Sequence, residues 1–280
     1  MAKKRSQQNP PSNSPARTAK PIRLVLIAAC ALAVLWAAFY LSRRGGAGGG
    51  PSAAARGERA GGIAYVTSDA CAECHALQFE EWKQSHHLRA MEPASPDTVL
   101  GDFNDAELTH MGEIFRFSTR DGRYFVTTGP SGGELAEHEI AYTFGFDPLQ
   151  QYLIEFPGGR LQCLTVAWDV AGERWYHLYP DEKIEADDAL HWTGRYQVWT
   201  HMCASCHTTD LRKNYDAGLD AYQTAWSEIG VGCEACHGPG ADHVAWAQAL
   251  PEGAQPDPAA YQLAFELKGR EPELEIQTCA

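Results

Sequence analysis

Three copies of one pentapeptide, Cys-x-x-Cys-His, constrain this chain more than any other feature. They read CAECH at residues 71–75, CASCH at 203–207 and CEACH at 233–237. Two thiols separated by two residues and followed at once by an imidazole form the attachment signal for haem c. The thiols add to the two vinyl groups of one haem, and the histidine is then placed to bind the iron from the same side. The pattern predicts three covalently bound haems c.

The motifs supply the predicted attachment residues and the predicted proximal iron ligands. The attachment residues are Cys71, Cys74, Cys203, Cys206, Cys233 and Cys236, and the proximal ligands are His75, His207 and His237. The sequence stops at Cys279-Ala280, which matches the first two residues of CAECH and CASCH. We expect Cys279 to open a fourth motif and the chain to be a fragment.

Other uses of paired cysteines explain this pattern less well. Two Cys-x-x-Cys elements can bind Zn²⁺ through four thiolates, but zinc does not require a histidine after every second cysteine. Three pairs also do not divide into sites of four ligands. A thioredoxin-like redox motif needs one pair on a βαβ scaffold, and structural disulfides need no histidines. Outside the motifs, Cys163 lies in a β-like run, where an inert core thiol is expected.

The sixth ligand of each iron decides between electron transfer and chemistry at the iron. His201 precedes Cys203 by two residues, so it lies on the attachment side of its own haem and can serve only a different iron. His243 follows His237 by six residues, across the turn-forming Gly238-Pro239-Gly240. We expect His243 to reach a neighbouring haem, which would hold adjacent haems in fixed contact.

Three further histidines are candidates for the same role. His86 and His87 are adjacent, and they cannot both bind one iron because successive side chains on a helix diverge by about 100°. His191 lies upstream of the second motif, in the run HWTGRYQVWTHMC. The residues alone therefore leave His191 and one of His86 and His87 as predicted sixth ligands.

Charge is distributed unevenly along the chain. Residues 1–60 contain ten Lys or Arg and one acidic residue, whereas the remainder contains 13 basic and 35 acidic residues. A domain this acidic does not fit a nucleic-acid binder, and its field favours cationic redox partners.

The basic start precedes an apolar run of 18 residues, LVLIAACALAVLWAAFYL at 24–41. As a helix this run is about 27 Å long, close to the roughly 30 Å hydrocarbon core of a bilayer. Cations before it would keep the N-terminus in the cytoplasm. The alternative is a cleaved signal peptide, but the run is long for one and lacks an A-x-A cleavage site at its end. The prediction is a single-pass bacterial inner-membrane protein with its haem domain in the periplasm.

The segments define the predicted domains. They are a basic cytoplasmic tail at 1–23, the transmembrane anchor at 24–41, a flexible Gly/Ala/Ser linker at 42–62 and a multihaem domain at 63–280. Within the last, alternating runs at about 101–185 predict a β-rich insert, with turns at Asp121-Gly122 and Pro157-Gly158-Gly159. The predicted fold class is α+β: a haem-packed domain, mostly helix and loop, with an antiparallel β-hairpin insert and an N-terminal transmembrane helix.

Four stretches of the chain carry a resemblance to a known family. They are SHHLRAM (85–91), YTFGFDPLQQYLIEFPGGRLQ (142–162), HWTGRYQVWTHMCASCHTTDLRKNY (191–215) and VGCEACHGPGADHVAW (231–246). Over residues 63–280 the sequence resembles the multihaem c-type cytochromes with paired motifs, the tetrahaem family related to that of nitrifying bacteria. Many relatives of this branch carry tetratricopeptide repeats after the haem domain.

The resemblance implies an exported electron carrier with closely packed haems, mostly with two histidine ligands and sometimes with one five-coordinate haem. The family pattern S-x-H-x-x-A-M selects His87 over His86, and C-H-G-P-G-x-x-H selects His243. The first hypothesis is therefore a periplasm-facing cytochrome that passes electrons between redox proteins. The alternative is an oxidoreductase in which one open haem acts on a small nitrogen or sulfur compound. No catalytic side chains are predicted, because no substrate-binding constellation is visible. A third hypothesis, a protein-docking scaffold, is compatible with the first.

Overall fold

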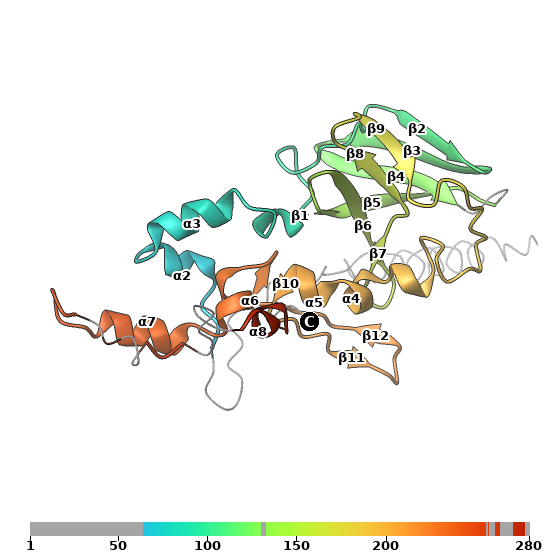
Figure 1. Cartoon of the computed structure of the whole chain (residues 1–280). Coiled ribbons are helices and arrows are strands. Elements are labelled where there is room, and N and C mark those ends of the chain that lie inside the picture. The colour runs from blue at the N-terminus through green and yellow to red at the C-terminus, as the bar shows by residue number, and fades with distance from the viewer. Residues whose placement is uncertain (1–63, 130–132, 256, 258–260, 264–270, 278–280) are drawn as a thin grey trace, which may run out of the picture. The chain divides into compact units, whose positions relative to one another are not determined.

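The computed structural model describes residues 64–129, 133–255, 257, 261–263 and 271–277 (Figure 1). The chain divides into the units Met1–Ala47 and Gly48–Ala280, and every described residue belongs to the second. Its largest element is a nine-stranded sheet, and no described helix exceeds eight residues. The prediction of a domain made mostly of helix and loop is therefore wrong. Each motif needs only a single helical turn, whereas alternating aromatic and β-branched residues continue through nine strands.

The sheet is antiparallel throughout and follows the chain closely. Its order is β2-β3-β4-β5-β6-β8-β9, with β1 beside β5 and β7 beside β6. The end strands β2 and β9 lie near each other at His110 and His177, whose stacked rings have centroids 3.9 Å apart. The strands are β1 Met91–Pro93, β2 Ala106–His110, β3 Glu113–Arg120, β4 Arg123–Gly129, β5 Ala136–Phe144, β6 Leu149–Phe156, β7 Arg160–Cys163, β8 Val166–Asp169 and β9 Arg174–His177.

Tight turns join the first strands. Asp121 and Gly122 have φ values of 53° and 72°, the left-handed pair that a two-residue hairpin requires, and Arg120 faces Arg123. This hairpin was predicted and is confirmed. Met111-Gly112, with φ values of 47° and 93°, connects β2 to β3 in the same way. No comparable signal for this second hairpin is present in the sequence, because methionine is uncommon in such turns.

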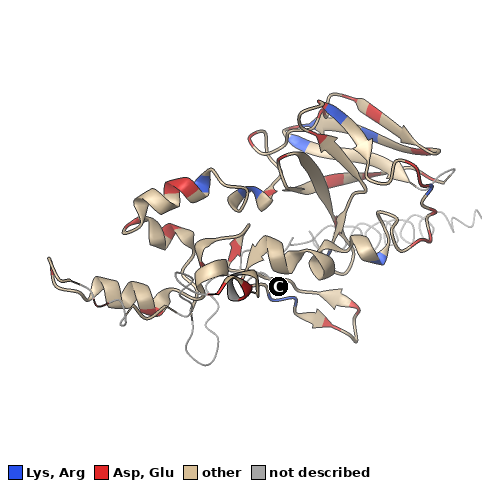
Figure 2. Cartoon of the chain, viewed as in Figure 1, with Lys and Arg blue, Asp and Glu red and all other residues tan. Residues whose placement is uncertain are grey.

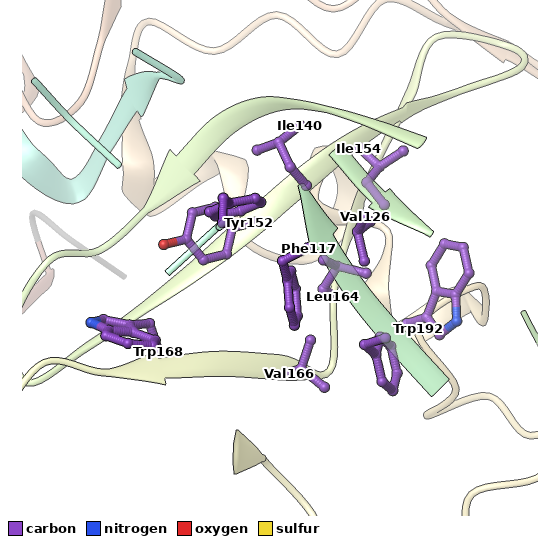
Figure 3. Close-up of a cluster of buried hydrophobic side chains, with 11 residues drawn as sticks. Phe117, Val126, Ile140, Tyr152, Ile154, Leu164, Val166, Trp168 and Trp192 are labelled. Carbon is purple, nitrogen blue, oxygen red and sulfur yellow. The ribbon is translucent and has the colours of Figure 1, made fainter. Parts of the chain in front are cut away.

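A cluster of buried, mostly aromatic and aliphatic side chains packs against the strands of the sheet (Figure 3). Phe117 and Trp175 stack in parallel at 3.6 Å, and Phe103 meets four aromatic rings edge-on. The cluster consists of the protein's own side chains, so the prediction of a haem-packed domain does not hold for this part of the chain. Its buried members are Phe103, Phe115, Phe117, Val126, Ile140, Tyr152, Ile154, Leu164, Val166, Trp168 and Trp192.

A second cluster connects the sheet to the second attachment motif. Leu161 of β7 donates its backbone N–H to Thr200 Oγ1 at 3.0 Å, next to Trp199. Cys163 is buried here, as predicted, and burial raises the pKa of its thiol. The sheet therefore serves as a rigid base for that motif. The buried members are Met91, Leu153, Leu161, Cys163, Trp199, Ala204 and Trp226.

The remaining elements are short. The helices are α2 Ser68–Ala72, α3 Ala76–Lys83, α4 Trp199–Met202, α5 Ala204–His207, α6 Cys233–His237, α7 Ala241–Gln248 and α8 Pro272–Gln277, with 3₁₀ turns at Leu88–Ala90 and Arg195–Gln197. Two small ladders pair β10 Thr208–Thr209 with β13 Glu228–Ile229 and β11 Tyr215–Asp216 with β12 Ala221–Tyr222.

The structure contradicts a membrane-spanning architecture for the part of the chain that it describes. None of those helices combines the length and the apolar character that a span requires. The predicted anchor at 24–41, the tail at 1–23 and the linker at 42–62 lie outside the described residues, as does Cys279. The inner-membrane and periplasmic assignment is not retained.

Candidate functional site

Each attachment motif folds as one turn of helix. In the first motif the backbone N–H of His75 donates to the carbonyl of Cys71 at 2.9 Å, and in the second Cys206 donates to Cys203 at 3.1 Å. The third motif is helix α6 itself. Residues three and four apart lie on one side of such a turn. The motif spacing therefore directs two thiols and one imidazole to a common side.

The first and third motifs lie against each other. Ser68 Oγ accepts the N–H of Cys233 at 2.9 Å and donates to Glu228 at 2.8 Å. The thiols of Cys71 and Cys233 are also hydrogen-bonded, which raises the pKa of Cys71 and lowers the pKa of Cys233. Motifs separated by more than 150 residues in sequence are thus neighbours in space.

A buried carboxylate fixes this arrangement. Glu234 is 4% exposed and accepts backbone N–H groups from Val66 at 3.0 Å, Thr67 at 2.8 Å and Gly240 at 2.7 Å. It lies inside the third motif, yet it joins the segment before the first motif to the turn after the third. Hydrogen bonds to a charged acceptor are stronger than those to a neutral one. All three donors here are backbone N–H groups, so the bonds fix the course of the main chain.

A cavity of about 290 Å³ opens between the first motif, the third motif and α7. A smaller cavity of about 50 Å³ is also lined by His75, together with Cys74 and Ala247. His75 and His243 line both. The larger cavity is lined by Cys71, His75, Gln78, Phe79, Cys233, Glu234, His237, Gly238, Gly240, His243, Val244 and Leu263.

His75 and His243 face each other across these cavities. Their ring centroids are 6.2 Å apart and their planes are inclined by 26°. His243 Nδ1 lies 2.5 Å from the backbone carbonyl of Tyr261. Because a carbonyl only accepts, Nδ1 must carry the proton, which leaves the lone pair on Nε2 for a metal.

His237 completes a group of three imidazoles. Partial burial lowers the pKa of His237, and the neighbouring His75 and His243 lower it further. A lowered pKa favours the neutral ring, which is the form that binds iron. The structure thus brings together three of the predicted ligands.

In the second motif, too, a backbone carbonyl bonds Nδ1 of the histidine. His207 Nδ1 lies 3.3 Å from the carbonyl of Ala90, so the hydrogen bond again leaves Nε2 with the lone pair. Burial lowers the pKa of His207, and its ring packs on Phe144 at 4.5 Å. The Ala90 carbonyl is itself held by the N–H of Gly145 at 3.0 Å.

The segment that contains His86 and His87 lies between the second and third motifs. The carbonyl of His87 accepts the N–H of Val231 at 2.9 Å, and Trp82 donates to the carbonyl of Val231 at 2.8 Å. The ring of His86 packs on Phe146 at 4.9 Å, whereas both histidines are exposed. This packing engages no ring nitrogen of His86, so the selection of His87 continues to depend on the resemblance in sequence.

The two other predicted ligands differ in their surroundings. His191 is 3% exposed, and both ring nitrogens are engaged, by Thr193 Oγ1 at 2.7 Å and Glu113 Oε1 at 3.1 Å. Neither nitrogen can coordinate iron without breaking a buried hydrogen bond. His201 is exposed on α4, with its backbone carbonyl bonded to Lys213.

The donor set fits haem c. Within the described ranges no three His, Cys, Asp or Glu side chains are arranged to hold a single metal ion. Two thiols and one imidazole per motif match a haem instead. Buried donors next to the second motif also lack acceptors among the described residues: Trp199 Nε1, Arg212 Nε and Arg212 Nη2.

Sequence reasoning missed the groups that orient the ligands. The carbonyls of Ala90 and Tyr261 leave no trace in the sequence, because any residue can supply a carbonyl. Glu234 carried no distinguishing signal either, because Glu73 inside the first motif is exposed whereas Glu234 inside the third is buried.

Comparison with known proteins agrees with the motifs. The model of the family cytochrome c554 and c-prime matches residues 70–109 and 170–238. Among curated proteins, none matches the chain in sequence. The crystal structure of the outer cell wall cytochrome OcwA is similar at 21% identity and a TM-score of 0.43, over 69% of this chain and 35% of that chain.

The matched segments include the first motif, the second motif and the third motif in full. Together, the match and the motifs support a multihaem c-type cytochrome that binds haem c covalently and transfers electrons.

Proposed function

We propose that this chain carries one haem c on each of its three motifs and passes electrons between redox proteins, with histidine as both axial ligands of most irons. The observation that carries this proposal is the opposed pair of imidazoles His75 and His243 beside the thiols of the first motif. When bound, haem c supplies an iron that alternates between the ferric and ferrous states.

The spacing of that pair supports a shared iron. A metal–imidazole bond is about 2 Å long. Two such bonds, together with the distance from each bound nitrogen to its ring centre, add up to about 6 Å, and the observed separation is 6.2 Å. His75 would be the proximal ligand and His243 the sixth ligand of the haem attached to Cys71 and Cys74.

The other proximal ligands are His207 and His237. We assign His87 as a sixth ligand for a haem on the second or third motif, since its segment contacts both. His201 stays a candidate for an iron other than that of its own motif. His191 is left out of the ligand set because both of its nitrogens are used.

The chain's own residues hold these ligands and limit access to them. Carbonyls orient His207 and His243, and the Glu234 carboxylate fixes the first motif against the third. With two histidines on an iron, no position is left for a substrate, which favours electron transfer over catalysis. A relation to the tetrahaem cytochromes of nitrifying bacteria fits the same assignment.

The partners we propose are cationic redox proteins. Beyond residue 60 the chain has 35 acidic and 13 basic residues. Figure 2 shows basic and acidic residues together on the sheet. Arginines there form ion pairs with neighbouring acids, such as Arg120–Glu137 and Arg116–Glu107. The remaining field is negative and would steer positively charged partners towards the protein.

Two measurements on the whole chain, produced with haem c maturation factors, test the proposal. Mass spectrometry of the denatured protein should show three haems attached by thioether bonds. Electron paramagnetic resonance of the oxidised protein should show mainly low-spin iron, as two histidine ligands require. A chain without covalent haem, or a spectrum dominated by high-spin iron, would contradict the proposal.

A further inference from the structure

A partly buried arginine, Arg212, lies next to the second motif and takes no part in the proposed ligand set. Arg212 lies five residues after His207, in a segment that pairs with Ala225 through two backbone hydrogen bonds of 2.7 and 2.8 Å. The same segment continues into the β10–β13 ladder, which runs from the second motif towards the third. The arginine is therefore held on rigid backbone between two attachment motifs.

Two of the three guanidinium nitrogens of Arg212 lack hydrogen-bond acceptors among the described residues. Its side chain is 22% exposed, yet Nε and Nη2 are buried and have no hydrogen-bond partner among the described residues. The nearest carboxylate oxygen, Asp210 Oδ2, is 3.7 Å from Nε, which is too long for a hydrogen bond. That oxygen already accepts a hydrogen bond from Ser227 Oγ at 2.8 Å.

Buried donors are almost always satisfied, so a charged one without an acceptor indicates a missing group. The guanidinium is planar and presents paired N–H groups that match a carboxylate. Haem carries two propionate carboxylates, and the second motif places a haem within a few residues of this side chain. A carboxylate of that haem is thus the acceptor with the right charge, shape and origin.

We propose that Arg212 binds a propionate of the haem attached to Cys203 and Cys206 and raises the reduction potential of that haem. This inference rests on the proposed function. A cation near the haem favours the reduced state, which carries one positive charge less. The haem beside Arg212 would therefore accept electrons more readily than it would without the arginine.

Potentiometric titration of the whole haem-loaded chain tests the inference. In Arg212→Gln, the same number of haems should be attached as in the parent, and one redox transition should shift to lower potential. Arg212→Lys, which keeps the charge but loses the planar donor pair, should shift less. The matched control is Arg174→Gln, because Arg174 forms an exposed ion pair with Asp169 on the sheet. A titration of Arg212→Gln that coincides with that of Arg174→Gln overturns the proposal.

A structure of the haem-loaded parent decides the same question without a variant, and it also serves if Arg212→Gln does not accumulate. The proposal requires a guanidinium nitrogen within about 3.2 Å of a propionate oxygen. A guanidinium bonded only to Asp210 overturns it. Mass spectrometry separates this failure from failure of the proposed function: a chain with haems but without the contact refutes only the role of Arg212.

Discussion

At the scale of single residues, the hydrogen bonds of each imidazole distinguish ligands from structural histidines. His207 and His243 bond a carbonyl through Nδ1 and keep Nε2 for a metal. His177 and His191 use both nitrogens inside the protein. The sequence predicts His207 from its motif, but it does not separate His243 from His191, since both are candidate sixth ligands there.

The contrast between His243 and His191 makes a sharp prediction. We expect His243→Ala to remove the sixth ligand of one iron, so that part of the low-spin signal in electron paramagnetic resonance becomes high-spin and carbon monoxide binds the reduced protein. His191→Ala should leave the spectrum unchanged and lower the stability instead, since it leaves Glu113 buried without this partner. High-spin iron in the His191 variant, or none in the His243 variant, would reverse the assignment.

Glu234 provides a second prediction at this scale. Glu234→Gln replaces one accepting oxygen by an NH₂ group that faces backbone donors from Val66, Thr67 or Gly240. The free energy of unfolding should fall by about 1–3 kcal/mol, as measured by denaturant titration of the haem-loaded protein. The control Glu139→Gln breaks only an exposed ion pair with Arg123 and should cost at most about 1 kcal/mol. Equal losses of unfolding free energy in the two variants would show that Glu234 does not hold the first motif against the third.

At the scale of elements, turns decide how the sheet meets the segments that carry the motifs. Gly158 and Gly159 join β6 to β7 with φ values of 77° and 68°, as the predicted Pro-Gly-Gly turn requires. The carbonyl of Gly158 accepts the N–H of Tyr222 at 2.7 Å. The turn therefore also holds the β11–β12 hairpin, which the sequence did not indicate.

Substitutions at Gly122 and Gly159, which have similar φ values, distinguish the cost of backbone strain from that of steric overlap. A Cβ on Gly122 would meet nothing within 4 Å, whereas a Cβ on Gly159 would overlap the carbonyl oxygen of Tyr222. Gly122→Ala should reduce the free energy of unfolding by about 1 kcal/mol through the left-handed backbone alone. Gly159→Ala should cost about 1–3 kcal/mol more, because backbone must move. Denaturant unfolding of both variants, followed by tryptophan fluorescence, measures the difference. Equal losses of unfolding free energy would show that the β11–β12 hairpin can move away from the added methyl group without loss of stability.

At the scale of the whole molecule, local sequence patterns predict individual turns, whereas the architecture depends on pairing between distant segments. The hairpin at Asp121-Gly122 and the turn at Pro157-Gly158-Gly159 follow from residue types that few other conformations accept. The nine-stranded sheet depends on long-range pairing, such as β6 with both β7 and β8, that no local pattern specifies. The motifs predicted the attachment residues, but which motifs adjoin depends on Ser68 and Glu234, whose partners are more than 160 residues away.

The acidity of the chain supports a prediction about how partners reach it. With a net charge of −13, the protein should attract cations over roughly one Debye length, about 10 Å at 0.1 M salt. Reduction of the oxidised protein by a cationic metal complex, hexaammineruthenium(II), should therefore slow as ionic strength rises. Oxidation of the reduced protein by anionic ferricyanide should accelerate, because the same screening weakens repulsion. Stopped-flow absorbance of the haem bands at several salt concentrations measures both rates. If the two rates respond to salt in the same direction, the exposed haem edges do not lie in the negative field of the chain, and the preference for cationic partners fails with it.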